Sequence, residues 1–297
     1  MSMALLRRIK YELEALARSD IDCGQFLNGI HTSNSSTDWK EFDRARDPYS
    51  AKACCLHSGL SFVETMMQAG FINDTKSGAA YFGTINTFIS YTWRSDPTGP
   101  KHITFANLVT AIESTLVANA SSLGGRRPED CYFFLDVLVC AQHRGMRPQS
   151  QTCPNATDVA KFAQVIDASE RLVFFATPLT QPKALKRVWC LFEIMSAIKR
   201  EKPVLVALSS SDREMLKELL LRDLDRIVTL FTTIKSENAE ATYDSDKVMV
   251  FNWIRRDLGE NGFLQLDQMV AGGMRLWIGE TAKELVEEAA VRLGEGS

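Results

Sequence analysis

The stretch Ile85-Asn86-Thr87-Phe88-Ile89-Ser90-Tyr91 decides the fold, because it is short, apolar and rich in residues that favour strands. Four similar apolar runs follow it, at residues 132–135, 172–176, 204–208 and 227–231. Segments with helical patterns separate these runs, the first from about residue 104 to residue 120. Continuous apolar strands that alternate with helices predict a parallel sheet that is covered on both faces. We therefore predict an α/β fold with a doubly wound sheet of about five strands.

The segments on either side of this region have helical patterns. Apolar residues at helical spacing predict a first helix at residues 3–18, and a second is predicted at about residues 51–69. Near the end of the chain, residues 245–258 and 279–293 also have helical periodicity, and we expect the pair Gly272-Gly273 to break the stretch between them.

These patterns divide the chain into three predicted parts. Residues 1–80 form an accessory helical region, residues 84–235 form the α/β domain, and residues 236–297 form a C-terminal helical extension. We see no internal repeat and no low-complexity segment.

Composition indicates a soluble protein of the cytoplasm. Charged residues make up 24% of the chain and the formal net charge is -3, so nothing suggests a nucleic-acid partner. No apolar run approaches the roughly 20 residues of a membrane helix, and the first residues lack the apolar core of a secretory signal. The seven cysteines are odd in number and irregularly spaced, which favours reduced thiols and no metal site.

Polar and aromatic side chains follow the predicted strands at the points where they end. Ligands of open parallel sheets bind at the carboxyl ends of the strands, near the point where the strand order reverses. The segments that we expect to reach such a site are residues 91–94, 136–143 and 177–182.

Three motifs on this scaffold resemble those of TIR (Toll/interleukin-1 receptor/resistance) domains. Phe88-Ile89-Ser90-Tyr91 resembles their first strand, Phe134-Leu135-Asp136 the end of their second, and Trp189-Cys190-Leu191-Phe192-Glu193-Ile194 a Trp-Cys-Leu-x-Glu-Leu segment of one of their helices. The order and separation of the motifs also fit. The resemblance covers about half of the chain and implies a flavodoxin-like fold with helical additions at both ends.

The chain also departs from the pattern of that family. Thr92-Trp93-Arg94 follows the first motif where many TIR domains have charged residues, and a long segment follows Asp136. With these departures, the chain resembles a divergent TIR-like group from unicellular eukaryotes or microbes more than an animal receptor domain. Residues 1–80 and the C-terminal extension have no counterpart that we can place.

The resemblance implies an enzyme that cleaves NAD, because a subset of TIR domains breaks the nicotinamide–ribose bond. Their catalytic glutamate lies in the helical motif, and the matching residue here is Glu193. NAD is then the substrate, and no cofactor or metal is expected. Nicotinamide leaves as a neutral base, so one carboxylate that stabilises positive charge on the ribose suffices in principle.

Aromatic residues are predicted to surround the bound ring. Trp189 lies four residues before Glu193 on the same helical face, and an indole face attracts a cationic pyridinium ring. Tyr91 and Trp93 could supply a second aromatic wall. The alternative for Trp189 and Cys190 is packing in the core, which is the more frequent role of such residues.

Three further residues complete the predicted binding site. Arg94 would meet the pyrophosphate, Asp136 would hold a ribose hydroxyl, and His143 would contribute from the following loop. The alternatives are that Asp136 caps a turn, that His143 is an ordinary loop residue, and that Glu193 is a solvated surface residue.

Two rival functions remain open at this point. The first is a TIR-type interaction module without catalysis, which self-associates or recruits partners. The second is a flavodoxin-like nucleoside deoxyribosyltransferase, which also places a carboxylate at an anomeric carbon. The resemblance places the NAD-cleaving enzyme in a signalling or defence pathway, with cyclisation or base exchange as further reaction outcomes. It also implies that the protein forms a homo-oligomer.

Overall fold

Four parallel strands form the centre of the molecule. The computed structural model describes residues 1–15, 61–68, 70–93, 103–121, 124–140, 161–232 and 234–294. Within these residues the sheet has the order β2-β1-β3-β4. The strands are β1 (Thr87–Ser90), β2 (Phe133–Phe134), β3 (Arg171–Phe175) and β4 (Val204–Ala207). They coincide with four of the five predicted runs, so the parallel α/β fold is confirmed.

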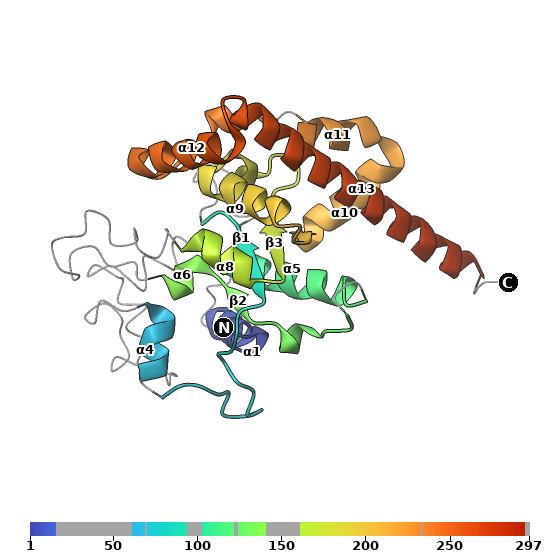
Figure 1. Cartoon of the computed structure of the whole chain (residues 1–297). Helices are drawn as coiled ribbons and strands as arrows, with labels where there is room; N and C mark the ends of the chain where they lie inside the picture. Colours follow the sequence, from blue (N-terminus) through green and yellow to red (C-terminus); the bar gives the residue numbers. More distant parts are fainter. Residues whose placement is uncertain are drawn as a thin grey trace.

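Helices cover both faces of this sheet (Figure 1). Along β3, Val173 and Phe175 belong to a core cluster with α1 (Met3–Ala15) and α5 (Phe105–Ala118). Leu172 and Phe174 belong to a second cluster with helices on the opposite face. Those helices are α8 (Phe162–Ala168), α9 (Val188–Lys199), α12 (Asp244–Leu258) and α13 (Gly262–Gly294). The alternation follows from the two-residue period of a strand, and it explains why every strand is apolar on both sides.

The remaining elements are short helices and turns at the edges of these layers. They are α4 (Phe62–Gln68), α6 (Asp136–Val139), α10 (Ser210–Arg222), α11 (Leu224–Thr232) and three 3-10 turns at Pro128–Asp130, Lys183–Lys186 and Ser236–Asn238. Within the described residues, no helix combines the length and the apolar character that crossing a bilayer requires.

The first residues of the chain pair with the edge of the sheet. The backbone N–H of Phe133 donates to the carbonyl of Met1 at 2.6 Å, and Ser2 forms an antiparallel bridge with Tyr132. The apolar side of α1 is then buried in the same core cluster as α5. The described part of the predicted accessory region therefore contributes to the core of the α/β unit, and the domain boundaries stay a prediction.

The prediction of a fifth strand at residues 227–231 is wrong, because these residues lie in helix α11. The side chain of Asp223 accepts a hydrogen bond from the backbone N–H of Arg226 at 3.1 Å, as a residue that caps a helix does. Ile227 is fully buried, whereas Leu224 is 50% exposed. Among the side chains of α11 that the structure describes, Ile227 is the buried one, and such uneven burial is the pattern of an amphipathic helix. It outweighs the strand preference of the residues themselves.

The predicted break at Gly272-Gly273 is also wrong, because α13 continues through both glycines. A Cβ atom added to Gly273 would lie 3.7 Å from Ile198 Cδ1 on α9, an ordinary van der Waals contact, so this part of α13 lies beside α9. A glycine inside a helix costs roughly 1 kcal/mol relative to alanine, which is not enough to end a helix that is packed against its neighbours. In Figure 1 the last turns of α13 extend away from the sheet.

Gly272→Ala is expected to raise the free energy of unfolding by about 0.5–1 kcal/mol, because alanine is the better helix former. A Cβ atom at this position meets no other atom within 4 Å. Urea unfolding measures the change. The contrasting variant is Gly83→Ala, whose Cβ would lie 2.6 Å from the ring of Tyr132 and which we expect to lower stability. A loss of stability in Gly272→Ala would contradict a continuous α13.

Candidate functional site

The candidate site lies at the carboxyl ends of β1, β2 and β3. The chain passes from β1 to β2 on one side and then returns to place β3 on the other side of β1. Strand order therefore reverses between β1 and β3, which is where ligands of open parallel sheets bind. Residues 91–93 follow β1, Asp136 follows β2, and residues 176–179 follow β3.

Three of the predicted site residues meet in one hydrogen-bonded group. The hydroxyl of Tyr91 donates to Asp136 Oδ1 at 2.6 Å, and Trp93 Nε1–H donates to Asp136 Oδ2 at 2.9 Å. The two aromatic residues are two positions apart, so an extended backbone directs both to the same side. Asp136 is the first residue of α6, and its Oδ1 also accepts from the backbone N–H of Val137 at 2.7 Å. The predicted aromatic wall and the predicted acid are thus in direct contact.

The environment of Asp136 acts on its carboxyl in two opposite ways. Burial raises the pKa of Asp136 above its ordinary value, and the hydrogen bonds from Tyr91, Trp93 and Val137 act against that rise. Both carboxylate oxygens accept hydrogen bonds from the protein. The contact of Asp136 with a ribose hydroxyl stays a prediction.

Glu193 is buried, on the side of α9 that faces the ends of the strands. Its side chain is only 6% exposed, so the interpretation of Glu193 as a solvated surface residue is wrong. Burial raises the pKa of Glu193 well above its ordinary value, and the negative charge of Asp136 raises it further. The nearby hydroxyl of Ser90 acts in the opposite direction. The two carboxyl groups therefore influence each other electrostatically.

Cys190 and Ser90 are the residues of this site that the sequence did not assign. The thiol of Cys190 donates to the carbonyl oxygen of Tyr91 at 3.3 Å, which ties α9 to the end of β1. Burial raises the pKa of this thiol well above its ordinary value, so it stays un-ionised. Ser90 is fully buried, and its hydroxyl has no hydrogen-bond partner within the usual limits of distance and angle. Two features of the sequence could have indicated these residues. Cys190 lies three residues before Glu193, and Ser90 places a hydroxyl inside an apolar strand.

Trp189 occupies a different environment from the Asp136 group. Its indole N–H donates to Asp246 Oδ2 at 3.2 Å. Its ring packs against aromatic rings of α8, α9 and α12, with centroid distances of 5.7, 6.3 and 6.0 Å to Phe162, Phe192 and Trp253. This arrangement favours the alternative in which Trp189 packs in the core. Its assignment to the substrate stays a prediction.

Trp189→Phe is expected to lower the free energy of unfolding by about 1–3 kcal/mol, because it removes the indole hydrogen bond and part of the buried ring. Urea unfolding measures this loss. We expect the KM for NAD to change little. A raised KM with unchanged stability would instead assign the indole to the substrate.

Two predicted binding residues, Arg94 and His143, lie outside the described residues. The described residues contain no group of three or more histidine, cysteine or acidic side chains arranged to hold a metal ion. Cys131, Cys140 and Cys190 are buried.

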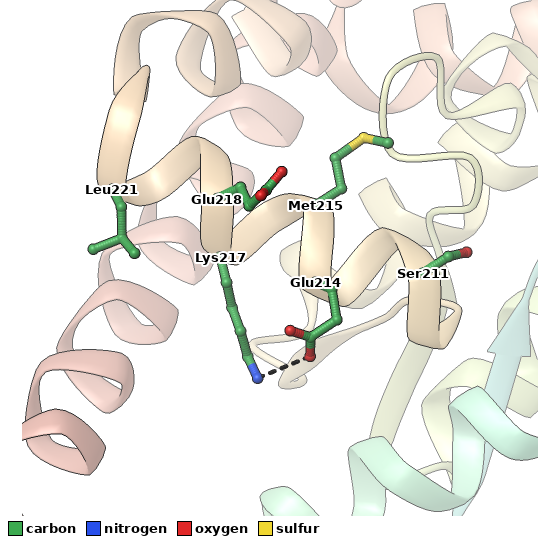
Figure 2. A pocket seen from close by; sticks show the side chains of 6 residues that line it. All are labelled: Ser211, Glu214, Met215, Lys217, Glu218 and Leu221. Atoms are coloured by element: carbon green, nitrogen blue, oxygen red, sulfur yellow. Dashed lines mark hydrogen bonds and ion pairs between the residues drawn. The ribbon is translucent and has the colours of Figure 1, made fainter. Parts of the chain in front are cut away.

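A shallow depression lies along α10 (Figure 2). Its lining residues all come from this one helix: Ser211, Glu214, Met215, Lys217, Glu218 and Leu221. Their side chains spread along the helix, and Glu214 and Lys217 form an ion pair at 3.0 Å. No buried polar group faces this depression from the six lining residues, so the strand ends are the better candidate.

Comparisons with protein families, with curated proteins and with solved structures gave no match for this chain. The resemblance to TIR domains therefore rests on the three motifs and on the fold that carries them.

Proposed function

We propose that this protein cleaves NAD at the bond between nicotinamide and ribose, with Glu193 as the catalytic residue. The observation that carries the proposal is the buried, electrostatically coupled pair of Glu193 and Asp136 at the carboxyl ends of the strands. Carboxyl groups whose pKa values are shifted by burial and by a charged neighbour are frequent in active sites. A role limited to structure does not explain why Glu193 is buried there with no cation among the described residues acting on its carboxyl group.

The chemistry requires little from the protein besides negative charge in the right place. When the bond between ribose C1′ and the ring nitrogen breaks, its electron pair stays on the nitrogen and neutral nicotinamide leaves. Water then forms the new bond to C1′ and gives one proton to the solvent. Positive charge develops on the ribose between these events, and a nearby carboxylate stabilises it more strongly in a site that excludes water.

The raised pKa of Glu193 suits a cationic substrate. A positive ring beside a carboxyl group favours its ionised form, so binding of NAD would itself promote ionisation of Glu193. The rings of Tyr91 and Trp93, which Asp136 holds together, supply an apolar and aromatic wall close to this pair.

The fold supports the same family. We propose that the sheet is flavodoxin-like and of the TIR type, because its order β2-β1-β3-β4 matches the first four strands of that arrangement. We also propose that the protein assembles into homo-oligomers, which light scattering of the full-length chain tests. Deletion of residues 1–80 is no clean test of assembly, because it removes α1 from the core.

The test of the proposal is release of nicotinamide when purified full-length protein is mixed with NAD. Turnover of NAD supports it. Transfer or release of bases from free deoxynucleosides, without cleavage of NAD, would select the deoxyribosyltransferase alternative. If NAD neither binds nor reacts at any protein concentration, the interaction module is the better account.

The value of kcat/KM is expected to rise with pH through the raised pKa of Glu193, because only the ionised carboxyl stabilises positive charge. The acidic limb of the profile should therefore lie well above the ordinary carboxyl value of 4.5. Initial rates in buffers of constant ionic strength give this profile. An acidic limb at or below that value would show that Glu193 is not the group that titrates.

A further inference from the structure

The two carboxyl groups of the candidate site have unequal partners. Asp136 accepts three hydrogen bonds, from the Tyr91 hydroxyl at 2.6 Å, from Trp93 Nε1–H at 2.9 Å and from the Val137 backbone N–H at 2.7 Å. Three donors that converge on one carboxyl group stabilise its ionised form. Two of these donors lie in the residues directly after β1 and the third lies in α6, so the preference is built into the fold.

Glu193 lacks comparable support. It is 6% exposed, and the hydroxyl of Ser90 is the neighbour that favours its ionised form. No hydrogen bond to that hydroxyl falls within the usual limits. A buried carboxyl without strong donors or a cation is more stable when it keeps its proton.

Within the part of the chain that the structure describes, the other titratable groups near the pair do not change this balance. On α9, Cys190 is an un-ionised thiol, and Arg187 is near enough to act on that thiol. On the β1 side, the Tyr91 hydroxyl is a donor to Asp136. On α4, which packs against α6, the carboxylate of Glu64 is exposed and accepts from the Ser61 backbone N–H. Among the described residues, Asp136 is the charged group that acts on Glu193.

We propose that Asp136 holds the negative charge of this pair and Glu193 holds its proton in the ligand-free protein, so that a ligand with a cationic ring binds with release of that proton. Tyr91 and Trp93 are then positioning residues, which act by fixing the charge on Asp136. The part that concerns the ligand rests on the proposed function. The part that concerns the proton does not.

A balance of charge follows from this assignment. The empty pair carries one negative charge, and the pair beside a bound cation carries two. The proton of Glu193 goes to the buffer, and the bound cation compensates the added charge. Neighbouring like charges seldom ionise together without such compensation, so a neutral ligand would leave the proton on Glu193.

Infrared spectroscopy of isotope-labelled protein tests where the proton lies. An un-ionised carboxyl group has a C=O stretching band that is separate from the bands of carboxylates. At neutral pH, labelling the glutamates with ¹³C at the side-chain carboxyl is expected to shift this band, and labelling the aspartates is not. A band that shifts with the aspartate label, or the absence of such a band, would overturn the assignment, and neither experiment needs a variant.

Variants connect the band to particular residues. Glu193→Gln should remove the band, and Asp246→Asn, a matched change at the partner of Trp189, should leave it in place. Asp136→Asn removes the neighbouring charge and should move the titration of the band to lower pH. Tyr91→Phe removes one donor from Asp136 and should move the same titration, which a purely structural role of Tyr91 would leave unchanged. An unmoved titration in both variants would overturn the coupling.

Calorimetry in two buffers with different heats of protonation tests whether binding of the ligand releases a proton. Nicotinamide methylated on its ring nitrogen is a cation that cannot be cleaved, and we expect it to bind with release of a proton. Unmethylated nicotinamide, which is neutral, should release none. Failure of the cation to bind, or binding without proton release, would overturn this part. If the infrared band assigns the proton to Glu193 but the protein leaves NAD intact, the proposed function alone is contradicted. If the protein cleaves NAD but the band assigns the proton to Asp136, this inference alone is contradicted.

Discussion

Glu193→Gln is expected to lower the rate of nicotinamide release by roughly 10²–10³-fold, as removal of one group that stabilises a charged transition state does. Glutamine has almost the same shape as glutamate, so the loss would come from the missing charge. The KM for NAD should change much less than kcat, because the charge matters most when the bond breaks. Measurement of initial rates over a range of NAD concentrations separates the two parameters.

The same variant is expected to be more stable than the natural chain at neutral and mildly alkaline pH. The pKa of Glu193 is higher in the folded chain than its ordinary value of 4.5. Its contribution to stability is therefore fully present below that ordinary value and is lost as pH rises through the folded value. Each unit of difference corresponds to about 1.4 kcal/mol.

Urea unfolding at several pH values provides the comparison. The two chains should have similar stability at the acidic end and should diverge as pH rises. Glu218→Gln, a matched change on the exposed side of α10, should show no such divergence. If Glu193→Gln is instead the less stable chain at mildly alkaline pH, Glu193 is ionised in the fold and the assignment of its proton is wrong.

Phe174→Ala is expected to lower the free energy of unfolding by about 3–5 kcal/mol, because it opens a cavity in a closely packed core. Phe174 is fully buried and lies on β3 between Ser90 of β1 and Val206 of β4. A loss of this size is a large fraction of the 5–15 kcal/mol that stabilises a typical domain. Urea unfolding and thermal unfolding both report it.

The control for this variant is Leu221→Ala on α10, where the side chain is 83% exposed. We expect that change to alter stability by no more than about 0.5 kcal/mol. A loss below about 1 kcal/mol in Phe174→Ala would mean that the core of the sheet is not packed as the structure has it.

The sequence predicted the central strands because their residues are apolar on both sides. Leu172 and Phe174 face one layer of helices while Val173 and Phe175 face the other, and such burial leaves a continuous apolar run in the sequence. The run at residues 227–231 has similar residue types, yet it forms a helix. The cap from Asp223 is a local contact with Arg226, three residues away, whereas the burial of Ile227 depends on tertiary packing that the local residue types do not encode.

The candidate site was predictable where the geometry follows from strand ends. Tyr91, Trp93 and Asp136 meet because parallel strands end at one edge of the sheet. The position of Trp189 was not predictable in the same way. Nine of the twelve residues of α9 are buried, so hydrophobic periodicity does not indicate which side of this helix faces the strand ends. The helix directs Trp189 towards α12 and Glu193 towards the pair with Asp136.

The measurement that tests the central claim most directly is release of nicotinamide from NAD by the natural chain and by Glu193→Gln, at equal concentration and over a range of protein concentrations. We predict that the natural chain releases nicotinamide catalytically, and that the variant, folded and at least as stable, releases it roughly 10²–10³-fold more slowly. Equal rates in the two chains, or no release by the natural chain at any concentration, would contradict the account.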